Sequence, residues 1–92
     1  VDAVLTAHLH TYRRRALIRD FAQNEQGTLY ILTGVAGNVR YPSLWHKNPL
    51  DEYVPPQPET NNYLVLEADE NSLTFNCYLP DNTQIDTVTL TK

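Results

Sequence analysis

The sequence predicts a small α+β domain in which strands dominate, and three observations lead to this prediction. The chain has 92 residues, which is enough for one domain and not for two. Two short apolar runs, residues 1–7 and 27–34, have the length and composition of strands. In the last third of the chain, residues 62–92, apolar and polar residues alternate as they do in strands with one buried face.

Composition and charge exclude several classes of protein. Apolar residues make up 41% of the chain and charged residues 20%, the balance of a globular domain rather than a disordered one. The net charge of −4 argues against a general nucleic-acid binder and against attraction to an anionic membrane. No apolar run approaches the roughly 18 residues of a membrane span. The single cysteine, Cys77, excludes an internal disulfide and a cysteine-rich zinc site.

The two apolar runs, "VDAVLTA" (1–7) and "GTLYILTG" (27–34), do not alternate cleanly between apolar and polar residues. Continuous apolar strands are usually covered on both faces, as in the middle of a layered sheet. The rest of the chain predicts no layer that could cover them. We therefore expect an exposed apolar patch along both runs.

Two connections separate the predicted strands. Residues 13–26 carry apolar side chains at near-helical spacing and predict an irregular connection with one helical turn. Residues 38–61 predict a long loop without regular sheet or helix, because this part of the chain is rich in proline, which lacks the backbone donor. We expect the loop to be a packed cover, since it is also rich in aromatic residues. These aromatic residues are Tyr41, Trp45 and Tyr53.

Residues 62–92 predict a three-stranded antiparallel meander. Two polar segments, "DENS" and "PDNT", have the composition of turns. Ile85 is out of phase with Val88 and Leu90, which predicts a bulge or twist near Asp86. We expect Cys77 to be a small core residue rather than a nucleophile. The apolar residues expected on one face of the first two strands are Leu64, Leu66, Ala68, Leu73, Phe75, Cys77 and Leu79.

Two of the three histidines lie one residue apart, directly after the first predicted strand. In an extended segment, His8 and His10 would project to the same side and could share one metal site. Ligand sites in open layered sheets gather beyond the carboxyl ends of strands, and imidazole binds zinc and iron. The alternative is a pair of surface or core histidines, because a catalytic zinc needs about three protein ligands. His46 lies among prolines without a partner and predicts no site.

A basic run and two glycines adjoin these features. Arg13, Arg14 and Arg15 could attract a phosphate-like group, or they could pair with acidic side chains. We favour pairing for Arg13 and Arg15. Gly34 and Gly37 lack the lysine and hydroxyl residue that end a P-loop, and we expect them to be glycines of a turn after a strand.

The stretch "VDAVLTAHLHTYRR" (1–14) resembles the last metal-binding block of the calcineurin-like metallophosphoesterases, in particular of the purple acid phosphatase branch. In that block an apolar strand with a leading Val-Asp is followed by Gly-His-x-His-x-Tyr-x-Arg. "GTLYILTGVAG" is similar to the family's next strand and glycine turn, and "YLVLEADENSLTFNCYLPDNTQIDTVTL" to its closing strands. The resemblance covers nearly the whole chain, although only the H-x-H-x-Y-x-R stretch is specific.

The resemblance implies a layered αββα fold and a binuclear metal centre of Fe with Zn, Mn or Fe. His8 would bind one ion and His10 the other, and a metal-bound hydroxide would attack a phosphate ester. Tyr12 and Arg14 match the motif and would support the histidine loop rather than take part in the chemistry. Two residues depart from the pattern. Ala7 replaces a glycine, and Arg13 stands where plant-type members often have glutamate, which points to a bacterial-type relative.

The family's Asp-x-His, Gly-Asp-x-x-Asp and Gly-Asn-His-Glu blocks do not occur in the sequence. We therefore expect the C-terminal part of a longer phosphoesterase, a piece with weak or no metal binding and little or no activity by itself. Residues 1–37 would be the last metal-binding block and its following strand, 38–61 a loop, and 62–92 the closing strands. The N-terminal remainder of the domain would be its partner, and a phosphate ester the parent's substrate. Export of bacterial relatives implies an extracytoplasmic parent.

A protein of another class is also compatible with the sequence, namely a self-sufficient β-rich binding or structural module without catalysis. In such a module His8 and His10 would have no joint role. The aromatic residues of the 38–61 loop could then line a surface for a partner or a carbohydrate, or could cover the edge of the sheet.

Overall fold

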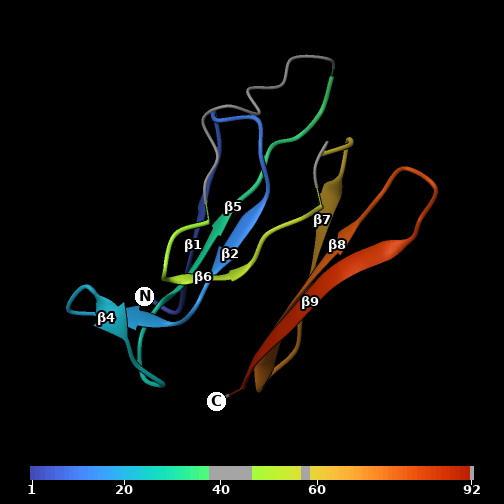
Figure 1. The fold of residues 1–92 in the computed structure, drawn as a ribbon. Helices are drawn as coiled ribbons and strands as arrows, with labels where there is room; N and C mark the ends of the chain where they lie inside the picture. The colour runs from blue at the N-terminus through green and yellow to red at the C-terminus, as the bar shows by residue number, and fades with distance from the viewer. Residues whose placement is uncertain (38–46, 57–58, 92) are drawn as a thin grey trace.

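The computed structural model describes residues 1–37, 47–56 and 59–91, and in these ranges the chain is built from strands (Figure 1). The prediction that strands dominate is confirmed, whereas the helical part of the α+β prediction is wrong for the described residues, which are all-β. No part of the chain that the structure describes forms a helix, and hence none forms one that could cross a membrane.

A four-stranded mixed sheet forms one layer, in the order β1-β5-β2-β6. β1 and β5 run parallel, whereas β2 is antiparallel to β5 and to β6. The amide of Thr33 donates to the carbonyl of Thr6 at 2.8 Å, so the carboxyl ends of β1 and β5 meet at one edge. The strands are β1 (Ala3–Thr6), β5 (Leu29–Leu32), β2 (Arg13–Arg15) and β6 (Asp51–Tyr53).

β6 corrects the expectation that residues 38–61 contain no regular sheet. Arg14 pairs with Tyr53 and Arg15 with Asp51, which makes β6 an edge strand of the mixed sheet. Such a strand needs ladder bonds on one side only, so a short one can form in a segment rich in proline. Tyr53 is half-buried against the core, as a packed cover requires. Tyr41, Trp45 and His46 lie outside the described residues.

The helical turn predicted in residues 13–26 is also wrong. This segment forms β2 and then a two-stranded hairpin, β3 (Ile18–Arg19) and β4 (Ala22–Gln23). The two residues between these strands, Asp20 and Phe21, have φ of 54° and 64°, as a type I′ turn requires. Phe21 is 97% exposed, so its near-helical spacing does not correspond to a shared apolar face.

Residues 62–92 form the predicted antiparallel meander, of β7 (Tyr63–Ala68), β8 (Ser72–Tyr78) and β9 (Gln84–Thr91). The predicted bulge is present, because the partner of Cys77 is Asp86 and the partner of the next residue is Gln84. Ile85 is thus the extra residue of β9.

The two turns of the meander depend on aspartate side chains. Asp69 accepts hydrogen bonds from the amides of Asn71 and Ser72, and Asp81 accepts one from the amide of Thr83. These bonds hold the carboxylate pKa of Asp69 and of Asp81 below the ordinary value. The turn predictions for "DENS" and "PDNT" are therefore confirmed.

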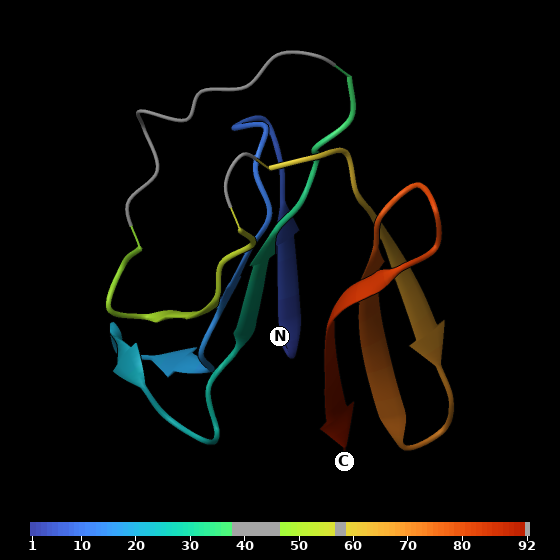
Figure 2. The same ribbon diagram turned by 45° about the vertical axis from the view of Figure 1, so that its right-hand side comes forward.

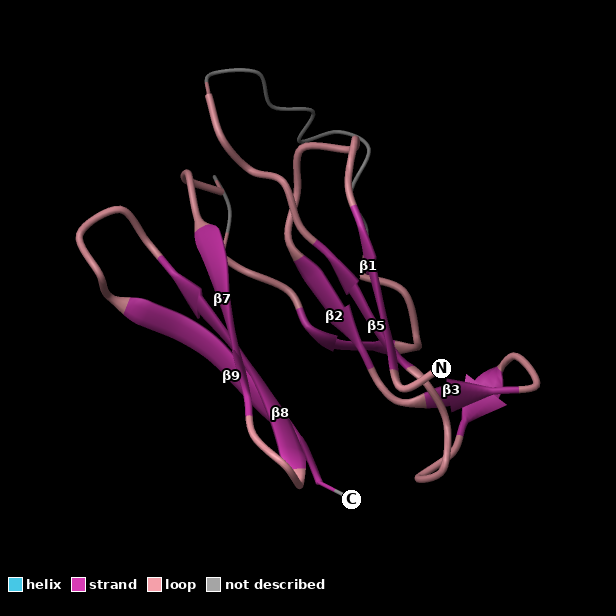
Figure 3. Ribbon diagram, turned by 180° about the vertical axis from the view of Figure 1, so that it is seen from behind, coloured by secondary structure: helices cyan, strands magenta, loops and turns pink. Residues whose placement is uncertain are grey.

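The mixed sheet and the meander face each other, and the core lies between them (Figures 2 and 3). Apolar side chains from β5 and from β8 meet there, and Cys77 is fully buried as predicted. The buried cluster comprises Tyr12, Leu29, Ile31, Val35, Phe75 and Cys77.

The expected apolar patch along residues 1–7 and 27–34 is present in part. Val1, Leu5 and Tyr30 are 96%, 48% and 38% exposed, although other residues of β5 are buried against the meander. The described residues thus leave apolar surface of β1 and β5 uncovered.

The two phenylalanines of the chain offer a matched test of this core. Phe75 is 2% exposed, whereas Phe21 is 97% exposed. We predict that Phe75→Ala lowers the free energy of unfolding by about 3–5 kcal/mol because it leaves a cavity between the sheets. Phe21→Ala should change it by less than about 0.5 kcal/mol. Urea unfolding measures both values, and losses of similar size would contradict the described packing.

Candidate functional site

Residues 7–10, here called the histidine loop, are the first part of the connection from β1 to β2, at the edge where β1 and β5 both end (Figure 1). β1 ends at Thr6, two residues before His8. The prediction that the histidines follow directly after a strand is therefore confirmed. His8 is exposed and His10 is half-buried.

The conformation of the loop differs from the extended segment expected for it. His8 has φ of 90° and His10 has φ of 52°. Because both residues are left-handed, the rule that residues two apart project to the same side of a strand does not apply to them. Their position in the chain, rather than strand periodicity, brings them to the same edge.

The structure also explains the alanine that stands at the glycine position of the motif. Ala7 is not one of the described residues with positive φ, so this position does not require glycine. Gly34, with φ of 135°, follows the end of β5 at the same edge. A Cβ at Gly34 would lie 3.5 Å from the Cβ of Ala7, so the two turns pass close to one another. Gly34 thus follows a strand with positive φ, as the sequence led us to expect of a glycine there, although this residue is not assigned to a turn.

Two residues of the motif bond to one buried carboxylate. The hydroxyl of Tyr12 donates to Oδ2 of Asp86 at 2.9 Å. Arg14 donates from Nε to Oδ2 at 2.8 Å and from Nη2 to Oδ1 at 3.1 Å, a bidentate ion pair. Since Asp86 belongs to β9, these bonds join the mixed sheet to the meander.

This environment shifts the pKa values of both donors. Burial raises the pKa of the Tyr12 phenol well above its ordinary value, and the negative charge of Asp86 raises it further. For Arg14, burial opposes the charged form, but the hydrogen bonds and charge of Asp86 outweigh it and raise the pKa. Tyr12 thus stays a neutral donor and Arg14 a cation. Neither is a general base, which agrees with the supporting role expected for them.

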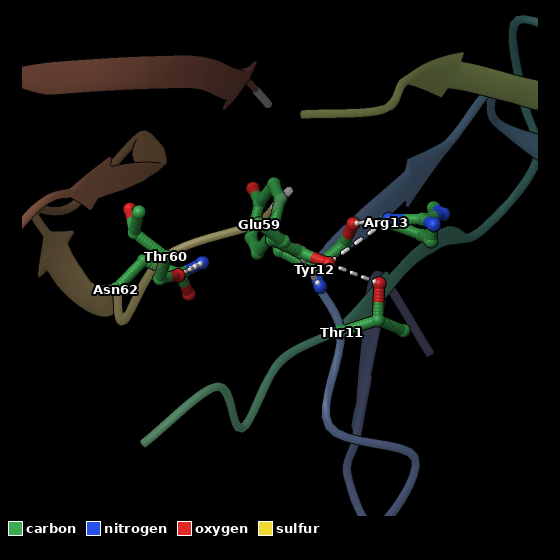
Figure 4. Close-up of polar contacts among 6 residues, drawn as sticks. All are labelled: Thr11, Tyr12, Arg13, Glu59, Thr60 and Asn62. Atoms are coloured by element: carbon green, nitrogen blue, oxygen red, sulfur yellow. Dashed lines mark hydrogen bonds and ion pairs between the residues drawn. The ribbon is translucent and has the colours of Figure 1, made fainter. Parts of the chain in front are cut away.

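A second buried carboxylate holds the residues between the histidines and β2 (Figure 4). Glu59 accepts a hydrogen bond from the hydroxyl of Thr11 at 2.7 Å and one from the amide of Tyr12 at 2.6 Å. Nη1 of Arg13 lies 3.6 Å from its Oε2. Glu59 is distant in the sequence from all three of its partners.

The basic run is paired with acidic side chains, as favoured for Arg13 and Arg15. Nε of Arg15 lies 3.0 Å from Oδ1 of Asp51, and Arg13 pairs with Glu59. Arg13 is buried rather than solvated, and its Nη1 also donates to the carbonyl of Tyr12 at 2.6 Å. Arg15 therefore joins β2 to β6, whereas Arg13 joins β2 to the segment before β7.

The histidine loop holds the candidate metal ligands that the sequence predicts. His8 and His10 supply two imidazoles, which is fewer than the three or so protein ligands of a catalytic zinc site. Within residues 1–37, 47–56 and 59–91, no three side chains of His, Cys, Asp or Glu gather where they could hold a metal ion. Further ligands would have to come from outside the described residues.

The sequence did not single out Glu59 as part of this arrangement, and it marked Asp86 only as the position of a bulge. Each lies more than forty residues from its partners in the motif. An isolated acidic residue in a proline-rich segment or in a strand gives no sequence signal for such a contact.

Comparisons of the chain with protein-family models, with curated proteins and with solved structures found no match.

A double-mutant cycle tests the contact between the sheets. Tyr12→Phe and Asp86→Asn should each lower the free energy of unfolding by about 1–3 kcal/mol, since each leaves a buried partner unsatisfied. The double variant should lose less than the sum, by about 0.5–3 kcal/mol. The control combines Tyr12→Phe with Asp69→Asn, because the Asp69 carboxylate bonds within its own turn. These two changes should add, and additivity of the first pair would contradict the contact.

The buried thiol and phenol predict loss of stability at alkaline pH. Burial, with the negative charges of Asp86 and Glu59, raises the pKa of Cys77 from 9.0 to about 12. Between those values the unfolded chain releases the thiol proton and the folded chain keeps it, so the free energy of unfolding falls as pH rises. Tyr12 acts in the same direction above its ordinary value of 10.0.

The measurement is urea unfolding at several values between pH 7 and pH 10. Cys77→Ala should lower stability at pH 7 but flatten the decline between pH 9 and pH 10, where the thiol accounts for most of it. An unchanged slope in this variant would contradict the assignment.

Proposed function

We propose that this chain is the C-terminal part of a binuclear-metal phosphoesterase of the calcineurin-like, purple acid phosphatase type. In this proposal His8 and His10 are metal ligands, one for each ion, and Tyr12 and Arg14 support them. The chain by itself has little or no hydrolytic activity, because the other ligands belong to the N-terminal remainder of the domain.

The observation that carries the proposal is the position of the histidine loop. It lies at the edge where the parallel strands β1 and β5 both end. In layered sheets, ligand sites gather beyond the carboxyl ends of parallel strands. The motif residues that follow, Tyr12 and Arg14, are both engaged by Asp86, which is what a support for the loop would require.

The residues of the chain have distinct tasks in this proposal. His8 and His10 hold the ions, and the segment that follows them fixes the direction from which the imidazoles approach. When bound, the two ions would supply the activated water and would neutralise the charge on the phosphoryl oxygens. No side chain of the described residues is assigned to proton transfer.

The outer face of the mixed sheet is compatible with a covering layer. A groove of about 540 Å³ lies there, lined mainly by apolar side chains. In the proposal the N-terminal remainder of the domain covers this face. The apolar side chains that line the groove are Leu9, Ile18, Phe21, Tyr30, Leu32 and Leu50.

The non-catalytic β-rich module is the alternative, since the two sheets already enclose a core within the described residues. The coding sequence upstream of Val1 distinguishes the phosphoesterase from the non-catalytic module. Asp-x-His, Gly-Asp-x-x-Asp and Gly-Asn-His-Glu blocks there would support the phosphoesterase, whereas an unrelated domain or a start codon would support the module.

The direct test is a titration of the chain with Zn²⁺, followed through the imidazole NMR resonances. We predict that the resonances of His8 and His10 shift together with weak affinity while those of His46 do not move, because two imidazoles form an incomplete site. His8→Ala should abolish the shift of His10, and His46→Ala is the matched control. No selective response of the pair would contradict the proposal, and so would robust metal-dependent hydrolysis of an aryl phosphate by the 92-residue chain.

A further inference from the structure

We propose that Glu59 is a positioning residue that fixes the histidine loop for metal binding. Its importance for metal binding rests on the proposed function, whereas its mechanical role can be tested without a metal.

The two carboxylate oxygens of Glu59 have separate tasks (Figure 4). Oε1 accepts the amide of Tyr12, and Oε2 accepts the hydroxyl of Thr11 and faces Nη1 of Arg13. One buried side chain thereby contacts the three consecutive residues that follow His10. Hydrogen bonds to a charged acceptor are about twice as strong as neutral ones.

The contact replaces strand pairing at a point where pairing is absent. In the ladder with β5, the first paired residue of β2 is Arg13. Thr11 and Tyr12 precede this ladder, so the amide of Tyr12 has no strand partner there and donates to Glu59 instead. A buried amide without an acceptor would be costly, and the carboxylate removes that cost.

Glu59 is itself held near the edge that the loop occupies. The amide of Asn62, three residues further on, donates to the carbonyl of Val35 at 2.9 Å. Val35 follows β5, the strand whose carboxyl end borders the histidine loop. Glu59 therefore connects the segment after β5 to the residues after His10. On the other side of the loop, the Thr6 carbonyl is fixed by the amide of Thr33. The loop thus spans two anchored ends.

The charge of Glu59 also has a partner. Arg13 is buried beside it, and an unpaired buried carboxylate would be strongly unfavourable. Mutation of residues that orient metal ligands without binding the metal themselves typically changes metal affinity by about 10–100-fold. Glu59 occupies such a place relative to His10, acting through the backbone of Thr11 and Tyr12.

The experiment compares three variants of the chain. Glu59→Ala removes both acceptors. Glu59→Gln keeps one acceptor oxygen for the Tyr12 amide and loses the charge. Asp51→Asn is the matched control, since Asp51 is an equally buried carboxylate that pairs with Arg15 and accepts the amide of Asn48, both of which lie outside the histidine loop. If Glu59→Ala does not fold, Thr11→Val removes one of the two hydrogen bonds in its place.

The first readout needs no metal. It is hydrogen exchange of the Tyr12 amide, expressed relative to the Ile31 amide of the core so that a general loss of stability cancels. We expect this ratio to rise roughly tenfold or more in Glu59→Ala, to change by less than about threefold in Glu59→Gln, and to stay constant in Asp51→Asn. The His8 and His10 resonances should shift or broaden in Glu59→Ala, or in Thr11→Val where that variant stands in, and should stay unchanged in Asp51→Asn. An unchanged ratio and unchanged histidine resonances in folded Glu59→Ala would overturn the proposal. In Thr11→Val the Tyr12 amide keeps its bond to Oε1, so where that variant stands in, unchanged histidine resonances would overturn the proposal.

The second readout is Zn²⁺ affinity. Glu59→Ala should weaken the affinity about tenfold or more, whereas Glu59→Gln should keep most of the affinity of the unchanged chain. If the unchanged chain does not bind Zn²⁺ at its histidines, the proposed function fails, while the exchange ratio still decides the mechanical role of Glu59. If the unchanged chain binds and Glu59→Ala binds equally well, the positioning role is overturned and the proposed function stands.

Discussion

The contact between the two sheets depends on one buried carboxylate, that of Asp86. It accepts the hydroxyl of Tyr12 and both arms of the Arg14 guanidinium, so β9 is tied to the start of β2. A buried charge is tolerated only where it is paired and hydrogen-bonded, and here Tyr12 and Arg14 supply these contacts from β2 and the residue before it. Asp86 shares a face with Val88 and Leu90 by simple alternation, and the bulge of β9, with Ile85 as the extra residue, lies directly before it.

The three consecutive arginines extend this principle to the whole of β2. Each pairs with a carboxylate from a different part of the chain, namely Glu59, Asp86 or Asp51. Their charges are therefore largely neutralised within the protein. In the proposed function, attraction of a phosphate ester falls to the metal ions rather than to the basic run. Alternate residues of an extended segment turn to opposite faces, so Arg13 and Arg15 form their pairs on one face of β2 and Arg14 forms its pair on the other.

The parts of the fold that the sequence predicted well are local. The meander, its two turns and the bulge near Asp86 follow from alternation and turn residues within a few positions of one another. β6 could not be predicted in the same way, since it forms by pairing with β2 across more than thirty residues. The hairpin at Asp20 and Phe21 was missed because two left-handed residues without glycine give a weak turn signal. Asp86 and Glu59 join the site through long-range contacts that no short motif encodes.

In the proposed function, the histidine loop is half of a metal centre, and two buried carboxylates hold it in place. X-ray absorption at the zinc edge of the Zn²⁺-loaded chain can detect such a centre. We predict nitrogen ligands at about 2.0–2.1 Å with the outer scattering of imidazole rings. This signal should vanish in the His8→Ala, His10→Ala double variant and persist in His46→Ala. Coordination by oxygen alone, or an imidazole signal that survives the double variant, would contradict the account.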